Sequence, residues 1–353
     1  IPGLRSVAGV SFPTNEVFAF NPNWENVATV YKWSFGVQQK LFVAMLLDMA
    51  YVGNTGRHLR HSRQLNTLPP GTRFLPSSND PTTNRPLPDN FLRPIPGYTN
   101  VSLRAEDVGW SNYHSFQLSL NRRKTGALQY GVAYTWSKAM GLSDEDSSGL
   151  PMFTSYRTYL YGKLPFDQTH VLAVNYAYRL PDMNFARGNA VGRGVFHGWS
   201  LSGITTFASG FPDGMSFAYA DGVDRTGGGD APRLWVRENP LLPRSERSFD
   251  RWFNTRAFAV PGRLEFGNAP RDVFRRPGIA NFDVTLGKDF KLTERFALQF
   301  RSEFYNVFNH TQFDGVDNTA RFDAQGSQIN ARFGQLTSAR AAREIQFSLR
   351  LQF

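Results

Sequence analysis

In the last stretch of the chain, REIQFSLRLQF (343–353), apolar residues occupy every second position from Ile345 onward. A period of two predicts a β-strand that has one apolar face and one polar face. An aromatic residue at the last position is unusual for a soluble domain, whose ends are commonly polar and frayed. The apolar row of this predicted strand is Ile345, Phe347, Leu349, Leu351 and Phe353.

The same period of two predicts strands of about ten residues or more through most of the chain. Tight hairpins are expected where only QKL, RKTGA or KLT separates two of them. One strand is expected to bend near Gly109. Residues 197–219 are expected to form one long strand bent at SGFP (209–212); the alternative is an additional pair of strands within residues 221–278. The predicted strands number about nine, or about ten if residues 1–29 add one: 30–39, 41–52, 98–123, 127–139, 168–180, 197–219, 279–290, 294–308 and 345–353.

The connections between these strands fall into two classes. Some have only a few residues, whereas others are long and rich in Gly, Pro, Asn and Asp. Compact soluble domains rarely hold several unstructured loops of more than about 15 residues, but outer-membrane barrels combine short periplasmic turns with long extracellular loops. The long connections are expected at 53–97, 140–167, 221–278 and 309–342.

An antiparallel transmembrane β-barrel and a large soluble β-sandwich both use alternating strands. The barrel is favoured because these strands approach the length that crosses a bilayer, whereas globular strands average about five or six residues. Aromatic residues also gather toward strand ends, at Tyr134 and Trp136 and at Tyr176 and Tyr178, as in the girdles of membrane barrels. The predicted fold class is therefore an all-β, antiparallel transmembrane β-barrel.

The order of short and long connections sets the direction of each predicted strand. If the short turns are periplasmic, the final strand descends and Phe353 ends on the periplasmic side. Single-chain bacterial barrels have even strand numbers, so an odd count leads us to expect that the barrel begins outside this sequence. Residues 1–29 are expected to be a lead-in segment or partial strand, and residues 30–353 the carboxy-terminal part of the barrel.

Composition agrees with a β-rich chain. Aromatic residues make up 14% and charged residues only 19%, while 31 Gly and 21 Pro supply turns. The chain has no cysteine, which excludes disulfides and thiolate metal sites. The net charge of +10 comes from scattered residues with no basic run longer than NRRK (121–124). We therefore expect contact with anionic lipid or an anionic ligand rather than with nucleic acid.

Several phrases resemble, in order, the carboxy-terminal barrel of Oar-like TonB-dependent outer-membrane receptors. The ordered series spans roughly residues 30–353, and no single phrase carries the resemblance. The phrases are WSFGVQQ, AYVGNTGRHL, NYHSFQLSLNRR, LQYGVAYTWSKAM, GWSLSGITTFASGFP, WFNTRAFAVP, FGNAPRDVFRRPGIANFDVTLGKDF and RFALQFRSEFYNVFNHTQF.

The resemblance implies part of a barrel of about 22 strands in the bacterial outer membrane. A plug domain, a regulatory-like β domain and the TonB box that couples to the TonB complex are expected to lie outside this sequence. The implied partners are outer-membrane lipid and lipopolysaccharide, the barrel assembly machinery, the TonB complex through the plug region, and a solute. A terminal Phe also resembles the signal that the assembly machinery reads, which gives the row ending in Phe353 a second role.

The implied function is uptake of a large or scarce solute, such as a metal chelate, an oligosaccharide or a peptide. Outer loops would capture the solute, and energised movement of the plug would open the lumen. The alternative from another class is a passive porin or structural surface barrel. No catalytic residue is expected, because the G-x-S-x-G, Walker A and H-E-x-x-H patterns are missing from the sequence; a barrel hydrolase with active residues on its loops is the enzymatic hypothesis.

Charged and polar residues on the polar faces of the predicted strands would point into the lumen. Arg301 and Glu303 are two residues apart, so they share a face and could pair with each other or with cross-strand partners. A lumen ion-pair network or contact with the plug is the favoured role, and direct contact with substrate is the alternative. The candidates are Asp48, Asp283, Gln299, Arg301 and Glu303.

Two acidic, glycine-bearing loops, DEDSS (144–148) and DGVDRTGGGD (221–230), could hold Ca²⁺ through oxygen ligands. Neither follows the EF-hand spacing, so plain external loops are favoured; the residues concerned are Asp144, Asp146, Asp221 and Asp224. His58 and His61 lie among arginines that would oppose a cation, which favours a solvated loop there. No other cofactor is expected.

Overall fold

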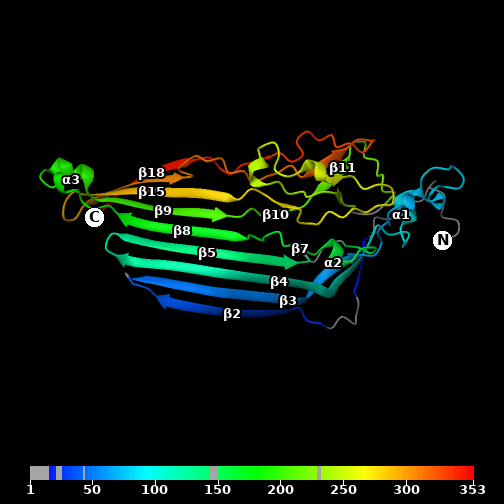
Figure 1. Cartoon of the computed structure of the whole chain (residues 1–353), viewed down its shortest axis with the longest axis horizontal. Helices are drawn as coiled ribbons and strands as arrows, with labels where there is room; N and C mark the ends of the chain where they lie inside the picture. The colour runs from blue at the N-terminus through cyan, green and yellow to red at the C-terminus, as the bar shows by residue number, and fades with distance from the viewer. Residues whose placement is uncertain (1–15, 21–25, 43, 143–149, 229–231) are drawn as a thin grey trace.

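The computed structural model describes residues 16–20, 26–42, 44–142, 150–228 and 232–353. Its main feature is a wall of long antiparallel strands with most of the long connections gathered at one end (Figure 1). Nine strands of the described chain follow one another across this wall in the order of the sequence. They are β2 (Thr29–Lys40), β3 (Met45–Gln64), β4 (Asn100–Thr125), β5 (Leu128–Gly141), β8 (His170–Arg179), β9 (Trp199–Ala208), β15 (Ile279–Lys291), β16 (Ala297–Tyr305) and β18 (Glu344–Gln352).

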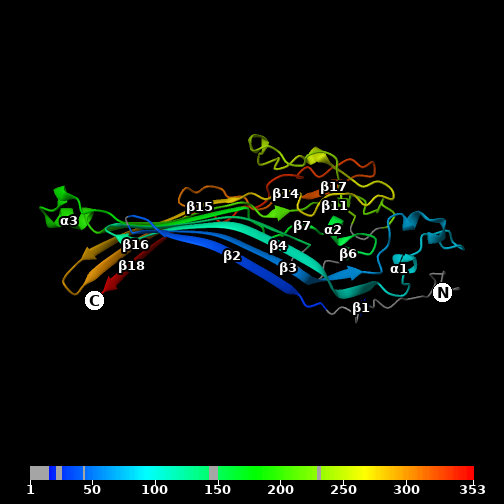
Figure 2. The same cartoon turned by 60° about the horizontal axis from the view of Figure 1, so that its bottom comes forward.

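The all-β antiparallel class and the count of about nine wall strands are confirmed by this up-and-down order. The directions also agree with the prediction, because the connections at 41–44, 126–127 and 292–296 lie at one end of the wall, with the carboxy terminus, and the four predicted long connections lie at the other (Figures 1 and 2). The connection 180–198, which was assigned to neither class, holds α3 and lies at the end with the short turns. β2 and β18 are the two ends of the sheet order. The wall is therefore an open part of a barrel.

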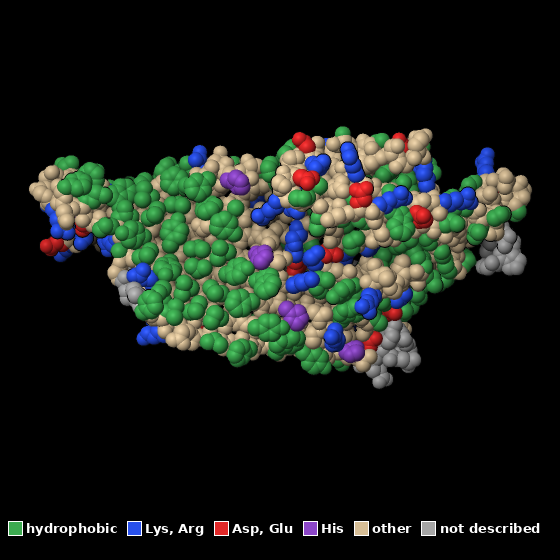
Figure 3. Space-filling view, viewed as in Figure 1, with side chains coloured by type: hydrophobic (Ala, Val, Ile, Leu, Met, Phe, Trp, Pro, Cys, Tyr) green, Lys and Arg blue, Asp and Glu red, His purple; other side chains and the backbone are tan. Residues whose placement is uncertain are grey.

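The cross-strand register places the apolar rows of neighbouring strands on one face. In the last pair, Phe300 lies opposite Leu349 and Leu298 opposite Leu351. These side chains cannot be explained as a buried core, because Phe347 is 66% exposed and Leu349 is 65% exposed. Figure 3 shows that hydrophobic side chains form a broad band over the half of the wall away from the long connections. A band of exposed apolar groups on one face is the pattern of a lipid-facing surface.

The first hairpin differs from its prediction. The turn lies at residues 41–44 rather than at QKL, and the Leu41 N–H donates to the Met45 carbonyl across it at 2.8 Å. The next strand, β3, continues to Gln64, so residues 53–64 are strand and not loop. Both errors arose because residue type was used to place the turn. The actual turn contains apolar residues such as Phe42, whereas GNTG (53–56), which is typical of turns, lies within β3.

β4 bends where predicted. Its pairing with β3 loses register at Leu59, which lies opposite Gly109, and again at His61 and Arg63. A side chain at position 109 would come within 2.5 Å of the Leu59 carbonyl oxygen, so only glycine allows this close approach. Successive bulges of this kind increase the local twist and turn the outer part of the hairpin away from the wall.

The predicted long strand at 197–219 is wrong. β9 ends at Ala208, after which the chain leaves the wall. Residues 216–219 form β11 (Ser216–Tyr219), which pairs in parallel with β17 (Thr319–Phe322) from another long connection. The alternation of upward and downward wall strands is kept, because the whole segment 209–278 is a single connection between β9 and β15. Period-two alternation could not separate the wall strand from a second short strand beyond it.

The long connections contain short elements that pack together. The strand segments are β1 (Glu16–Ala19), β6 (Leu150–Pro151), β7 (Gly162–Lys163), β10 (Pro212–Asp213), β12 (Trp235–Val236), β13 (Phe258–Ala259) and β14 (Phe274–Arg275), in addition to β11 and β17. The helical segments are α1 (Asp89–Leu92), α2 (Tyr156–Tyr159), α3 (Ala190–Phe196), η1 (Thr72–Phe74), η2 (Pro76–Ser78), η3 (Asn184–Ala186), η4 (Arg244–Glu246) and η5 (Thr255–Ala257). None of the helices in the described ranges has both the length and the apolar character needed to cross a membrane.

The outer connections have a hydrophobic core of their own. Phe253 is fully buried, and its ring lies 4.9 Å from that of Phe274 and 5.1 Å from that of Phe333. The same cluster includes Leu234, Ala257, Phe258, Ala269, Val273, Val316, Ala320, Phe322 and Leu336. Because this cluster joins residues 209–278 to residues 306–343, these two connections form one packed cap and not separate open loops.

Candidate functional site

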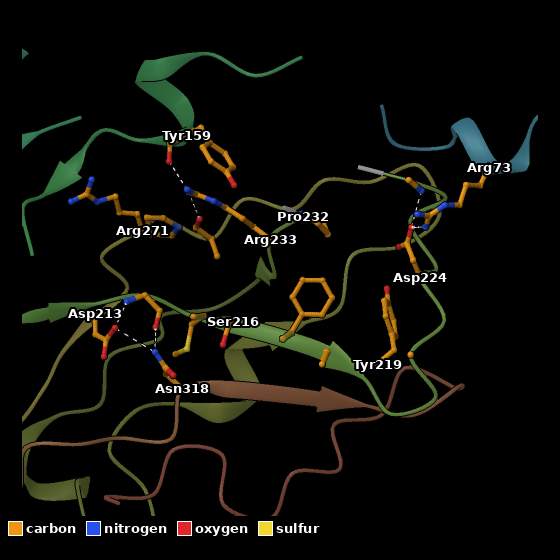
Figure 4. A pocket seen from close by; sticks show the side chains of 18 residues that line it. Arg73, Tyr159, Asp213, Ser216, Tyr219, Asp224, Pro232, Arg233, Arg271 and Asn318 are labelled. Atoms are coloured by element: carbon orange, nitrogen blue, oxygen red, sulfur yellow. Dashed lines mark hydrogen bonds and ion pairs between the residues drawn. The ribbon is translucent and has the colours of Figure 1, made fainter. Parts of the chain in front are cut away.

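A pocket of about 870 Å³ opens among the outer connections (Figure 4). β11 lines it with Ser216, Phe217, Ala218 and Tyr219, and Met215 lines it just before the strand. The other sides come from residues far apart in the sequence: Arg73, Tyr159, Asp213, Gly214, Gly222, Asp224, Gly228, Pro232, Arg233, Ala269, Pro270, Arg271 and Asn318. A concave site that mixes aromatic, apolar and charged groups has the character of a small-molecule binding pocket.

Arg233 is fixed on one side of the pocket. Its guanidinium donates hydrogen bonds to the carbonyls of Ala269 at 2.9 Å and Tyr159 at 2.5 Å, and it lies 3.7 Å from the centre of the Tyr159 ring. Burial lowers the pKa of this guanidinium from its ordinary value, although arginine stays charged at any physiological pH. Among the described residues no carboxylate is paired with this guanidinium, so it favours an anionic ligand group.

The opposite side is held by Asp224. One carboxylate oxygen accepts from Arg73 at 2.6 Å and from the Gly228 N–H at 2.8 Å, while the other accepts from the Thr226 N–H at 2.8 Å. These bonds join the loop after β11 to the 3-10 helix η1. The Asp224 carboxylate thus helps to order this glycine-containing loop, together with the backbone bonds from the Gly71 N–H to the Thr226 carbonyl at 3.0 Å and from the Arg73 N–H to the Gly227 carbonyl at 2.7 Å.

Tyr219 faces the pocket from the end of β11 (Figure 4). Burial, reinforced by the nearby Asp224 carboxylate, raises the pKa of the phenol, and its hydroxyl oxygen has no hydrogen-bond partner within the described chain. A buried hydroxyl without a partner is costly, because it has lost its water. A ligand that offers an acceptor at this point would recover that cost.

The lumen candidates are separated along the wall. Asp283 and Glu303 line one hollow of about 370 Å³, together with Ile204 and Tyr305. There the Asp283 carboxylate accepts from Asn281 at 2.8 Å and from the Asn306 N–H at 2.9 Å. Asp48 accepts from Gln38 at 3.1 Å on the first hairpin, and Gln299 donates to Asp289 at 3.0 Å. Their roles as lumen contacts stay predictions.

Arg301 and Glu303 lie on the same face of β16, as the alternation predicts. Arg301 lies opposite Gly287 and Ser348, whereas Glu303 lies opposite Thr285 and Gln346. The Tyr305 hydroxyl donates to the Glu303 carboxylate at 3.4 Å. Their part in a lumen network therefore stays a prediction.

The proposed calcium ligands have other partners. Asp221 is paired with Arg225 at 2.6 Å, and this hydrogen bond holds the pKa of the carboxyl well below its usual range. Asp224 has the arginine and N–H donors given above, so Ca²⁺ would have to displace them. Asp144 and Asp146 lie outside the described residues. Within the described ranges, His, Asp and Glu form no group of three or more that could hold a metal ion.

His58 and His61 lie in the strand β3 and not in a solvated loop. His61 is only 2% exposed, and its ring lies 5.9 Å from that of Tyr156. The loop expectation failed because four of the five residues in the run RHLRH are arginine or histidine, which normally lie at the surface.

Apart from Asp224, which was a calcium candidate, the pocket residues were not predicted from the sequence. Arg73, Tyr159 and Arg233 come from three different long connections, and each stands alone in its own segment. One available signal was the apolar alternation in MSFAY (215–219), which continues beyond SGFP. It was interpreted as more wall strand, although it marks the strand that lines the pocket.

The open wall, its exposed apolar band and the packed outer connections define the class: a β-barrel wall that crosses a membrane as strands. The family model for the outer membrane beta barrel domain matches residues 2–346. The chain belongs to that family, and its location is the bacterial outer membrane.

Solved structures of outer-membrane transporters are similar in fold. The outer membrane transporter YddB from Escherichia coli is 10% identical, with a TM-score of 0.46, and the match covers 92% of this chain and 32% of that one. The Ferric-Catecholate import receptor Fiu from E. coli K12 is 12% identical (TM-score 0.40; 92% and 27%). The FrpB iron transporter from Neisseria meningitidis is 11% identical (TM-score 0.42; 95% and 32%). This chain thus spans about a third of their length, and no curated protein matches it.

Proposed function

We propose that this chain is the carboxy-terminal part of the barrel of a TonB-dependent outer-membrane receptor that takes up a large or scarce solute. The observation that carries the proposal is the pocket of about 870 Å³ in the cap of packed outer connections. A pore for passive diffusion has no use for a shaped pocket at its outer end, whereas a receptor must capture its solute before transport.

The open edges of the wall support a larger barrel. A strand edge within hydrocarbon would leave backbone N–H and C=O groups without partners, which costs several kcal/mol for each group. β2 and β18 end the sheet order, so other strands must pair with both of them in the membrane. The resemblance to Oar-like receptors predicts where these strands come from: the rest of a larger barrel. It also predicts a plug and a TonB box elsewhere in the protein.

Metal chelates, oligosaccharides and peptides are the proposed classes of solute. The aromatic rings of Tyr159, Phe217 and Tyr219 offer apolar faces, and Arg233 offers an uncancelled cation. These groups suit a bulky solute that has a flat or ring-bearing part together with anionic oxygens. Anionic metal chelates combine both features and are the first class to test.

Uptake of labelled solutes by cells with and without TonB tests this function. Cells expressing the protein should accumulate at least one solute from a panel of ferric chelates, oligosaccharides and peptides, and accumulation should stop when TonB is deleted. Ala218→Trp should reduce capture about tenfold or more, because the new ring fills an exposed position that lines the pocket. The matched control is Ala324→Trp, which is exposed outside the pocket.

Two results would contradict the proposal. Accumulation that continues without TonB, together with a steady conductance of the purified protein in a planar bilayer, would favour the passive porin. Equal capture by the Ala218→Trp protein and the wild type, at equal outer-membrane levels, would show that the pocket does not bind the solute.

A further inference from the structure

The strand β11 has one edge without a partner strand, and this edge borders the pocket in the cap. Within the described chain, β11 pairs only with β17, in a two-stranded sheet. Figure 4 shows β17, which begins after Asn318, on one side of β11, and Tyr159 and Arg233 across the pocket on the other. All four residues of β11 line the pocket, although their side chains alternate between two faces. This is expected when the edge of a strand, rather than one face, borders a cavity.

Backbone hydrogen bonds show which groups of β11 point to this free edge. The Ser216 N–H donates to the Asn318 carbonyl at 3.1 Å, so the even-numbered residues of β11 bond to β17. Successive backbone N–H groups of a strand point to opposite edges, so those of Phe217 and Tyr219 point away from β17. The Phe217 carbonyl points the same way, whereas the Tyr219 carbonyl already accepts from the Gly222 N–H at 3.1 Å. Two donors and one acceptor are therefore directed to the free edge.

The chain of β14 occupies the same edge just before the pocket and then leaves it. The Arg276 N–H donates to the Phe211 carbonyl at 2.9 Å, beside the antiparallel pair of β10 and β14. Phe211 and Phe217 are six residues apart, an even spacing that directs their backbone groups to the same edge of an extended chain. The pairing of β14 is not continued at Pro270, which lines the pocket and has no N–H to donate. A ligand strand would lie where β14 would lie if it continued along β11.

Arg233 lies across the pocket from this edge and provides a positive charge there (Figure 4). Two backbone carbonyls and an aromatic ring hold its guanidinium, and no carboxylate of the described residues is paired with it. The Asp213 carboxylate, which also lines the pocket, is already paired with the Arg276 guanidinium at 2.5 Å. The Asp224 carboxylate is paired with Arg73 at 2.6 Å. An anionic group of a ligand is therefore attracted to Arg233.

We propose that the solute of this pocket is a short extended peptide that carries a carboxylate. Its backbone adds a third strand to β11 and β17 at the free edge, and its carboxylate lies at Arg233. The inference rests on the proposed receptor function and narrows its three classes of solute to one. Aromatic rings and a cation suit all three classes, whereas backbone donors and acceptors at strand spacing suit a peptide backbone.

The variants Phe217→Pro and Phe217→Ala separate the backbone from the ring. Both lose the ring, but only proline also removes the N–H at the free edge, where proline is tolerated because this N–H lies outside the ladder. The probe is a mixture of synthetic tetrapeptides with an acetylated amino end, random residues, and glutamate with a free carboxy terminus at the last position. Binding to the protein isolated from outer membranes in mild detergent should be about tenfold weaker for Phe217→Pro than for Phe217→Ala. Heat-modifiable mobility on gels shows that each variant is folded, and equal binding by the two folded variants would overturn the proposal.

N-methylated peptides test the same edge without a change in the protein. In a strand added to β11, alternate peptide N–H groups face β11, and the carboxylate at Arg233 fixes the register. Two mixtures are compared, one methylated at the first and third amides and one at the second and fourth. Binding should be about tenfold weaker for one of these mixtures and little changed for the other. Equal binding by the two methylated mixtures would contradict strand pairing.

Removal of the carboxylates tests the role of Arg233 and identifies the carboxylate that it binds. One mixture keeps glutamate but has an amidated carboxy terminus, a second has glutamine and a free terminus, and a third has glutamine and an amidated terminus. The third, uncharged mixture should bind about tenfold more weakly than at least one of the other two. Equal binding by all three would overturn the proposal. Capture of a ferric chelate or an oligosaccharide that Ala218→Trp reduces, with no binding of any peptide mixture, would overturn this inference and leave the receptor function intact.

Discussion

Individual carboxylates and rings order the outer connections at the residue scale. Asp224 joins the loop after β11 to η1 through Arg73, and Phe253 is enclosed by the rings of Phe274 and Phe333. One contact is polar and partly exposed, whereas the other is apolar and fully buried. Their contributions to stability should therefore differ in size and in their response to the solvent.

Asp224→Asn should speed hydrogen exchange of the amides at residues 224–228. The neutral amide loses the ion pair with Arg73, and we expect a local loss of about 1 kcal/mol, because both side chains are partly exposed. Treatment of the wild type with EGTA should leave exchange unchanged. An EGTA effect equal to that of the substitution would instead show that Ca²⁺ orders the loop. The control is Asp250→Asn, at an exposed carboxylate elsewhere in the cap.

Phe253→Ala should open the cap. Removal of a fully buried ring costs about 3–5 kcal/mol, since a cavity remains between Phe274 and Phe333. We expect faster proteolysis within residues 209–278, with the wall strands still protected. Leu241→Ala, at a side chain that is 48% exposed, should leave the cleavage rate unchanged. Equal cleavage rates of the two variants would mean that the cluster does not hold the cap together.

The sequence predicted single residues well only where a period determined their face. Ile345, Phe347 and Leu349 follow a strict alternation, and the structure places them in one exposed row. Arg73, Tyr159 and Arg233 have no such period, because packing of distant connections brings them together. Sequence separation carries no information about contacts that arise only after the cap has folded.

At the scale of elements, strand existence was easier to predict than strand ends. All nine wall strands coincide with predicted alternating stretches, but turn chemistry misplaced both ends of β3, and continued alternation beyond SGFP misplaced the end of β9. The turn between β2 and β3 contains no Gly or Pro, because the pairing of the two strands on either side determines where the chain turns. The bend at Gly109 was predictable, because glycine permits a close approach that other residues forbid.

Deletion of Phe353 should lower the amount of folded protein in the outer membrane. The side chain follows β18 directly and is 94% exposed, so its loss removes no packing within the described chain. The expected defect is therefore in recognition by the barrel assembly machinery. Phe42→Ala, at an 80% exposed side chain in a periplasmic turn, is the matched control. Normal outer-membrane levels of the deletion would count against the assembly role of this row.

Lys288→Met should loosen the connection between β8 and β9. The Lys288 ammonium donates to the carbonyls of Val195 at 2.8 Å and His197 at 3.0 Å, at the end of α3. Without these bonds, we expect trypsin supplied from the periplasmic side to cleave faster after Arg193. Lys291→Met, at an exposed lysine of the same strand, should not change the rate. Unchanged cleavage in both variants would show that α3 is held by other contacts.

At the scale of the whole molecule, three surfaces have distinct chemistry. The apolar band faces lipid, the pocket in the cap collects groups from several connections, and the rim between them carries basic side chains, among them Lys138, Lys163 and Arg275. Alternation in the sequence predicted the first of these, because one strand suffices to reveal its period. The other two depend on how strands and connections assemble, which one sequence does not display.

The central claim is that the apolar face of this wall contacts lipid in the outer membrane. The chain has no cysteine, so single cysteines with nitroxide labels can be placed at consecutive positions 346–351 of β18 without a background signal. In outer-membrane vesicles, collision of the label with oxygen should be high at Phe347, Leu349 and Leu351 and low at Gln346, Ser348 and Arg350, with the opposite pattern for a water-soluble nickel complex. Collision rates without this period of two, or with nickel favoured at the apolar positions, would contradict the account.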